Sequence, residues 1–235
     1  MKRLAAVVVC MALAMSGAAL AAGDATLKGE KERLGYSIGM DIGGTLKRQG
    51  IELDLDSVMK GIKDMYTGGK TLLTEEEMAQ EFKTLQTKLM ARQAEEMKKA
   101  AEKNKSEGEK FLAENAKKEG VKTLPSGLQY MELQPGTGKT PTIDNTVTTH
   151  YSGTLIDGTE FDSSYKRGTP ATFPVSGVIG GWTEALQLMK EGAKWRLFIP
   201  PELAYGERGN GPIGPNSTLV FEVELIKVVD KTADK

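Results

Sequence analysis

Aromatic side chains, rather than acids, bases or nucleophiles, are the residues of this sequence whose types and spacing could support chemistry. Trp182 follows Gly180 and Gly181 and shares one face of a short helical pattern with Leu186 and Met189. Glycines permit a close backbone approach, so an indole raised beside them can form the floor of an apolar pocket. The alternative is that Trp182 only fills a hydrophobic core. Aromatic residues on both sides of this segment favour the pocket.

The candidate pocket residues are aromatic or aliphatic, with a single acidic neighbour. Most lie in short runs that alternate as β-strands do, so a sheet must bring them to the helix that carries the indole. These residues are Tyr151, Phe161, Asp162, Phe173, Val178, Ile179, Trp182, Tyr205 and Phe221.

The sequence lacks the residues that several other common kinds of functional site require. The run Gly136–Thr140 resembles the end of a phosphate-binding loop, but Pro141 begins a strand-like stretch where that loop requires a helix. His150 is the only histidine and Cys10 the only cysteine, so a zinc site lacks ligands, a serine nucleophile lacks its base, and His150 is expected to be structural or exposed. The formal net charge of −1 offers no cationic excess for phosphate backbones. We expect no cofactor, no metal and no nucleic-acid partner.

Residues 1–22 have the pattern of a secretory signal peptide. Lys2 and Arg3 precede an apolar run, and Ala19-Leu-Ala21 supplies the small residues of a cleavage site. The apolar run is too short for a permanent membrane anchor. Cleavage there removes Cys10 and both early cations, which lowers the formal net charge from −1 to −3. We expect an exported, periplasmic protein that is stabilised by packing rather than by disulfides.

Residues 23–73 are predicted to form a helical dimerisation region. Between Lys31 and Gln49, leucine and isoleucine recur every fourth residue, and a second helix starts after Asp54 or Asp56 and stops at Gly68-Gly69. A stripe of glycines runs beside the first apolar face. Each glycine costs a helix about 0.5–1 kcal/mol relative to alanine, so the stripe indicates a close backbone crossing, with a partly unfolded segment as the alternative. The stripe consists of Gly35, Gly39 and Gly43.

A capping box at Thr74–Glu77 begins a helical pattern that continues to about Glu119. Its apolar stripe ends after Ala101, so we expect a long connecting helix over residues 74–120 whose far end, Lys98–Lys118, is a solvated strut. In a single chain, two short helices and the apolar half of the long helix enclose little hydrophobic core. We therefore expect a homodimer formed through the N-terminal helices.

Residues 121–235 are predicted to form an α+β domain. Lys122–Gly127 is typical of a linker, and Asp157-Gly158 of a hairpin turn. Four or more alternating segments with one short helix predict an antiparallel half-barrel sheet wrapped on that helix. The strands are expected within residues 128–133, 147–156, 160–164, 195–199 and 219–225.

Five runs in this C-terminal domain share their order and spacing with one known family. They are Val147-Thr-Thr-His-Tyr-Ser-Gly153, Gly158-Thr-Glu-Phe-Asp-Ser-Ser164, Val178-Ile-Gly-Gly-Trp182, Ile199-Pro-Pro-Glu-Leu-Ala-Tyr-Gly206 and Leu219-Val-Phe-Glu-Val-Glu-Leu225. Over about residues 126–229 the chain resembles the FKBP-type peptidyl-prolyl cis/trans isomerases. Its N-terminal half is similar to the dimerisation region of the macrophage infectivity potentiator (Mip) group of exported FKBPs.

The resemblance implies a prolyl ring seated on Trp182. It also implies that the Ile179 backbone N–H and the Tyr205 hydroxyl hold substrate carbonyls, and that Asp162 orients polar groups at the rim. The implied pocket walls are Tyr151, Phe161, Val178, Ile179 and Phe221, with Phe173, Arg167 and Ile213 as further substrate contacts.

The implied activity is rotation about X–Pro bonds in unfolded or proline-containing client polypeptides, with macrolides such as rapamycin as inhibitors. A peptide bond rotates over a barrier of about 18–20 kcal/mol because resonance is lost midway. The twisted amide has less charge separation than the planar one, so a dry apolar site favours it relative to water. The alternative function is a non-catalytic chaperone that holds extended segments. The N-terminal half could also be a mere spacer.

Overall fold

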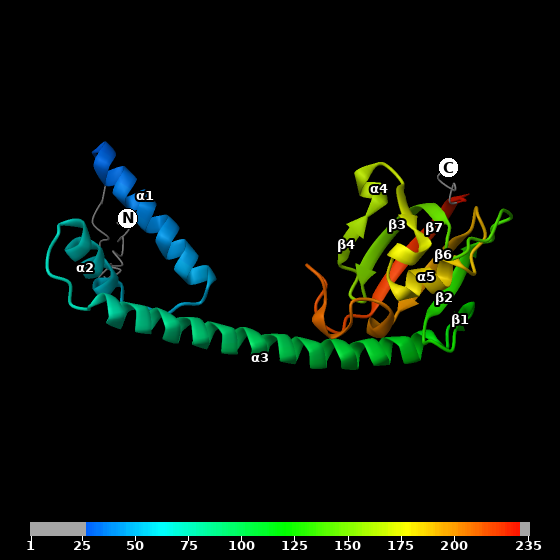
Figure 1. Ribbon diagram of the computed structural model, residues 1–235, viewed down its shortest axis with the longest axis horizontal. Helices are drawn as coiled ribbons and strands as arrows, with labels where there is room; N and C mark the ends of the chain where they lie inside the picture. The colour runs from blue at the N-terminus through cyan, green and yellow to red at the C-terminus, as the bar shows by residue number, and fades with distance from the viewer. Residues whose placement is uncertain (1–26, 231–235) are drawn as a thin grey trace, which may run out of the picture. The chain divides into compact units, whose positions relative to one another are not determined.

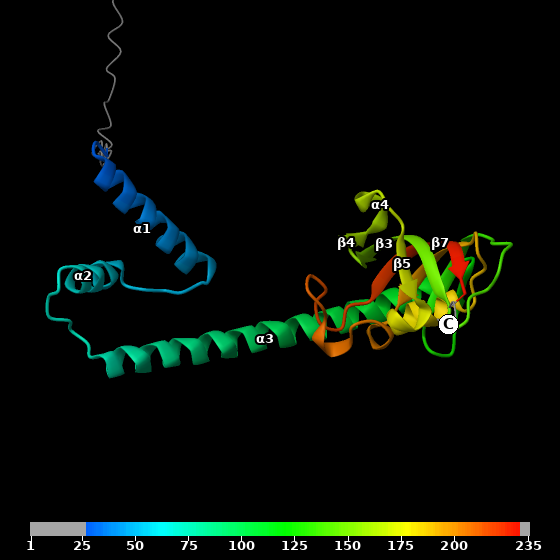
Figure 2. The same cartoon turned by 45° about the horizontal axis from the view of Figure 1, so that its top comes forward.

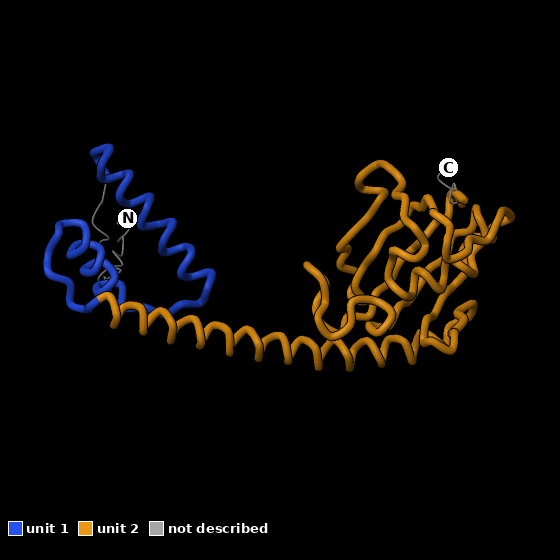
Figure 3. The backbone as a smooth tube through the Cα atoms, viewed as in Figure 1, with its two compact units in different colours: residues 1–74 blue, residues 75–235 orange. Residues whose placement is uncertain are grey.

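The structure is a computed structural model that describes residues 27–230, so the predicted signal peptide lies outside the described residues. The chain forms two compact units, residues 1–74 and 75–235 (Figure 3). Across residues 27–230, no helix combines the length and the apolar character needed to cross a membrane.

The first unit contains the two predicted helices, α1 (Glu30–Arg48) and α2 (Leu55–Tyr66). Asp54 caps α2, and its Oδ2 accepts a hydrogen bond from the Ser57 backbone N–H at 2.9 Å. No residue of either helix is buried, and Leu34 on the apolar face of α1 is 62 % exposed. A methyl group added at any glycine of the stripe in α1 would meet no atom within 4 Å. The apolar faces of this unit are therefore open in the single chain.

The second unit begins with α3 (Glu75–Asn115), which passes through Gly108 without interruption. The far end, predicted to be a solvated strut, is solvated on one side only: most of residues 98–118 are exposed, but Gly108 and Asn115 are buried. Asn115 Nδ2 donates to Gln129 Oε1 at 3.0 Å, and the Phe111 ring lies 6.0 Å from that of Phe198. This segment therefore has a packed face that its polar composition does not indicate. Two amides and a glycine make part of the contacts that apolar residues usually make.

The sheet of the second unit is antiparallel in every pairing. Its strand order is β1-β2-β6-β7-β3-β4 (Figure 1), and β5, labelled in Figure 2, also pairs with β3. The prediction that residues 122–127 form only a linker is wrong, because β1 occupies part of that segment and pairs with β2. The strands are β1 (Val121–Thr123), β2 (Gln129–Gln134), β3 (Thr146–Leu155), β4 (Glu160–Ser163), β5 (Ala171–Pro174), β6 (Lys194–Ile199) and β7 (Leu219–Val229).

The core lies between the sheet and α5 (Gly180–Leu186), which rests against it in both views (Figures 1 and 2). Alternate residues of β3 are buried from Val147 to Gly153, and α5 contributes Trp182 and Leu186. Burying one such apolar side chain stabilises the fold by about 1.5–3 kcal/mol. The predicted α+β sheet wrapped on a short helix is confirmed. A one-turn helix, α4 (Ser164–Arg167), and short 3₁₀ turns complete the unit.

Candidate active site

The floor of the site is the Trp182 indole, which α5 presents at its first turn. A methyl group added at Gly181 would lie 2.6 Å from Ile199 Cγ2, so only glycine lets α5 approach β6 this closely. Trp182 is 4 % exposed. Gly181 therefore sets the depth at which the indole lies.

Three aromatic rings stand edge-on to this floor. The ring centroids of Tyr151, Phe221 and Phe173 lie 5.2, 5.4 and 6.0 Å from that of Trp182, with interplanar angles of 87°, 82° and 87°. Phe161 meets Phe221 in the same way, at 5.5 Å and 81°. Each edge-to-face contact adds about 0.5–1.5 kcal/mol beyond area burial. These contacts hold the walls of the site upright around the indole.

The rings line an open cavity of about 550 Å³. Every predicted site residue lines this cavity except Arg167, which lies behind the rim. Four lining residues were not predicted: Gly177, before the helix that carries the indole, and Asn210, Gly211 and Pro212, which lie in a Gly- and Pro-rich segment typical of a turn. The lining consists of Tyr151, Phe161, Asp162, Phe173, Gly177, Val178, Ile179, Trp182, Tyr205, Asn210, Gly211, Pro212, Ile213 and Phe221.

Besides the buried Trp182 Nε1, the two donors that the resemblance assigns to substrate carbonyls have no partner in the part of the chain that the structure describes. Within residues 27–230, neither the Ile179 backbone N–H nor the Tyr205 hydroxyl has a hydrogen-bond acceptor. Ile179 is the N-cap of α5, where the first N–H groups of a helix have no partner inside it. A carbonyl of a bound ligand could accept a hydrogen bond from either group.

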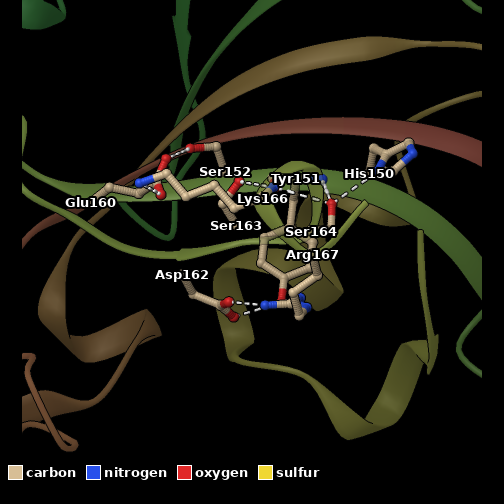
Figure 4. A network of polar contacts seen from close by, with 9 residues as sticks. All are labelled: His150, Tyr151, Ser152, Glu160, Asp162, Ser163, Ser164, Lys166 and Arg167. Atoms are coloured by element: carbon tan, nitrogen blue, oxygen red, sulfur yellow. Dashed lines mark hydrogen bonds and ion pairs between the residues drawn. The ribbon is translucent and has the colours of Figure 1, made fainter. Parts of the chain in front are cut away.

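Tyr151, Asp162 and Arg167 form a polar triad (Figure 4), and the first two of these residues line the cavity. The Tyr151 hydroxyl donates to Asp162 Oδ2 at 2.6 Å, and Arg167 donates both to Asp162 and, at 2.7 Å, to the Tyr151 oxygen. Burial acts to raise the pKa of the Asp162 carboxyl, but the hydrogen bonds from Tyr151 and Arg167 outweigh it and hold that pKa below its usual value. Burial, reinforced by Asp162, raises the pKa of Tyr151. The rim is therefore a carboxylate beside a neutral phenol.

Comparison with known proteins identifies the family. A family model described as FKBP-type peptidyl-prolyl cis-trans isomerase matches residues 137–226, and one described as the domain amino terminal to that isomerase matches residues 31–131. The outer membrane protein MIP of Legionella longbeachae is 52% identical over 220 residues, which are 93% of this chain and 94% of the relative. The chain belongs to the FKBP-type peptidyl-prolyl cis/trans isomerases. The resemblance found in the sequence is confirmed.

Other FKBP-type relatives match over most of their length. FkpA of Escherichia coli K12 is 41% identical over 211 residues, which are 87% of this chain and 78% of the relative. The crystal structure of FkpA from E. coli superposes with a TM-score of 0.73 at 40% identity and covers 87% of this chain and 99% of that one. A peptidyl-prolyl cis-trans isomerase structure from Pseudomonas syringae covers 55% of this chain and 96% of its own, with a TM-score of 0.52 at 45% identity.

In this FKBP-type chain, Ser164 joins the triad to the sheet (Figure 4). Its buried Oγ accepts from the Tyr151 N–H at 2.7 Å and donates to the Tyr151 carbonyl at 3.1 Å, so it continues the ladder where β4 ends. The Ser164 Oγ also lies 3.0 Å from His150 Nδ1, and the His150 ring stacks on Tyr165 at 4.6 Å. These contacts agree with the structural role expected for His150, because they hold α4, and with it Arg167, beside Tyr151.

Proposed function

We propose that this chain catalyses cis/trans rotation about X–Pro bonds in the cavity over Trp182. The supporting observation is an aromatic floor and walls beside two free donors, Ile179 N–H and Tyr205 O–H. Uncatalysed X–Pro exchange takes tens to hundreds of seconds, slow enough to limit folding. A millionfold acceleration corresponds to about 8 kcal/mol of barrier lowering.

The proposed mechanism separates the two sides of the rotating bond. The prolyl ring lies on the Trp182 indole, and the Ile179 N–H and Tyr205 hydroxyl hold carbonyls of the substrate so that one side stays fixed while the other turns. Asp162, held by Tyr151 and Arg167, orients polar groups at the rim. The apolar walls disfavour the planar amide relative to the twisted one, because the planar form has the larger charge separation. Macrolides such as rapamycin are expected to occupy the same cavity.

We further propose that the enzyme is an exported, periplasmic homodimer. Residues 1–22 supply the secretory pattern, and the open apolar faces of α1 and α2 supply a surface for a second copy. Two cavities in one dimer would hold an unfolded client polypeptide at two points and raise the effective concentration of the second contact. The dimer would then assist folding in two ways, by catalysing X–Pro rotation in the client and by holding the client polypeptide.

The test is an isomerisation assay on the mature chain with a proline-containing peptide. NMR exchange spectroscopy measures the rate of cis/trans exchange in the peptide. The variants are Tyr205→Phe, which loses one donor, and Asp162→Ala, which breaks the rim. Tyr165→Phe is the matched control, because Tyr165 is outside the cavity and its hydroxyl donates to Glu224 at 3.1 Å. We expect both site variants to slow catalysis and the control to retain it. No catalysis by the mature chain would overturn the proposed function, and unchanged rates in both site variants would overturn the roles of these two residues.

A further inference from the structure

One wall of the cavity belongs to the segment of residues 206–217, here called the pocket loop. Its tip, Asn210–Ile213, lines the cavity, and Ile213 is 6 % exposed. The tip is closed by a single bridge in which the Asn210 N–H donates to the Ile213 carbonyl at 2.8 Å and the Ile213 N–H donates back at 2.9 Å. No strand ladder extends beyond this bridge, so the position of the wall depends on the packing of Ile213 in the core and on contacts at the base of the loop.

The base of the pocket loop has an unusual backbone. Asn216 is the only non-glycine with a positive φ, 52°, among residues 27–230, and its N–H donates to the Gly206 carbonyl at 2.9 Å. The Ser217 hydroxyl donates to the Gly214 carbonyl at 2.9 Å. These bonds close the loop on itself, but they do not fix the loop to the rest of the second unit.

The external support comes from α3. Asn104 Nδ2 donates to the Pro215 carbonyl, 111 residues away in the sequence, at 2.8 Å, and it lies 3.4 Å from Ser217 Oγ. A methyl group added at Gly108, one turn further along α3, would clash with Thr218 Oγ1. In both views the segment that precedes β7 runs beside α3 (Figures 1 and 2). The connecting helix therefore carries the base of a loop whose tip forms a wall of the cavity.

We infer that Asn104 is a positioning residue of the isomerase site, which makes α3 a determinant of substrate binding. This inference rests on the proposed function. The Asn104 amide fixes the Pro215 carbonyl, the loop base transmits that position to Ile213, and Ile213 limits the space for the substrate on that side. Asn104 touches no substrate, so its removal should weaken binding and leave the rotation step intact.

The test compares three substitutions in the mature chain. Asn104→Leu keeps the volume and removes both donors, and Asn104→Asp places a carboxylate against the Pro215 carbonyl. Glu102→Gln, at an exposed position of the same helix, is the control. NMR line shapes at several peptide concentrations give kcat and KM separately, and amide hydrogen exchange at Asn210 and Ile213 reports the loop directly.

We expect KM to rise about three- to tenfold in Asn104→Leu, the loss of one ordinary hydrogen bond, with kcat within about twofold of wild type. Asn104→Asp should raise KM further, and exchange at Ile213 should become faster in both. A KM and loop exchange equal to those of Glu102→Gln would overturn the inference. So would a loss of kcat accompanied by faster exchange throughout the sheet, because that pattern indicates a general loss of stability.

A second pair of variants tests the same coupling without Asn104. Gly108→Ala should displace the loop base and raise KM, and the added change Thr218→Ala should restore KM because it removes the clashing Oγ1. A Gly108→Ala variant with normal KM and normal loop exchange contradicts the inference. If the wild-type chain does not isomerise the peptide, the proposed function fails, and the exchange rates at Asn210 and Ile213 still decide whether Asn104 positions the loop.

Discussion

The rings of Tyr151 and Trp182 meet edge to face, with centroids 5.2 Å apart and planes at 87°. From the same ring, the Tyr151 hydroxyl donates to Asp162 at 2.6 Å. One side chain thus contributes to the aromatic wall through its ring and to the polar rim through its oxygen. Because the ring and the hydroxyl act on different parts of the site, substitutions can alter the polar rim without altering the aromatic walls.

A pH series tests the rim. The folded-state pKa of Asp162 is below its usual value, so its stabilising effect is complete above the unfolded-state pKa of about 3.9 and is lost as pH falls through the folded-state pKa. Asp162→Asn should therefore lower the denaturant midpoint by a constant amount from about pH 7 to about pH 5, and the difference should shrink only below about pH 4. Asp144→Asn, at an exposed carboxylate before β3, is the control. A difference that already disappears near pH 5 would show that the Asp162 pKa is not lowered.

Gly153 tests how tightly the walls pack. A methyl group added there would lie 2.5 Å from Phe221 Cε1 and 2.8 Å from Phe161 Cε2. Gly153→Ala should lower the free energy of unfolding by about 1–3 kcal/mol, as overpacking does, and should also reduce kcat/KM because both rings bound the cavity. Urea unfolding and the peptide assay measure the two effects. Ser152→Ala on the same strand should change neither strongly, and a Gly153→Ala variant that matches it would refute the close packing.

A substitution at Gly39 tests whether this glycine lies at a dimer contact or at a helix position that accepts a larger side chain. Within the single chain a methyl group at Gly39 meets nothing within 4 Å, so Gly39→Ala should favour the helix by about 0.5–1 kcal/mol if no second copy is present. If the glycine stripe is a backbone crossing, the same change should weaken dimerisation, which sedimentation velocity at falling concentration measures. Ser37→Ala, on the other side of α1, is the control. A monomeric wild-type chain would contradict the homodimer.

The sequence was sufficient to predict the elements whose apolar residues recur regularly. Helices α1 and α2, and strands β3, β6 and β7, follow their periodicity, and the burial of alternate residues in β3 matches the pattern. The sequence of β1 predicts a linker because its three residues show no alternation, and it predicts no strand at β5 because Pro170 precedes that strand and Pro174 is its last residue.

The part of the candidate site that consists of aromatic side chains was predictable from the sequence. The part that a loop contributes was not. Tyr151, Phe161 and Phe221 could be grouped with Trp182 from residue type, order and spacing. The contribution of Asn210 and the position of Arg167 behind the rim depend on a turn and a one-turn helix whose geometry no periodicity encodes. The packing of α3 was hidden because Asn104 and Asn115 look like surface residues, although the lone Gly108 was a signal of close approach.

The central claim is that the Trp182 indole is the floor on which the prolyl bond turns. Trp195 offers a matched control, because both indoles are at most 5 % exposed, and among the described residues neither Nε1 has a hydrogen-bond partner, but only Trp182 lines the cavity. Trp182→Leu and Trp195→Leu should each destabilise the fold by about 2–4 kcal/mol.

The most direct measurement is kcat/KM for a proline-containing peptide in both variants, at a temperature where both are folded. We predict at least about a tenfold loss for Trp182→Leu, which is about 1.4 kcal/mol of transition-state stabilisation, and a value within about twofold of wild type for Trp195→Leu. Equal activity in the two variants would contradict the account.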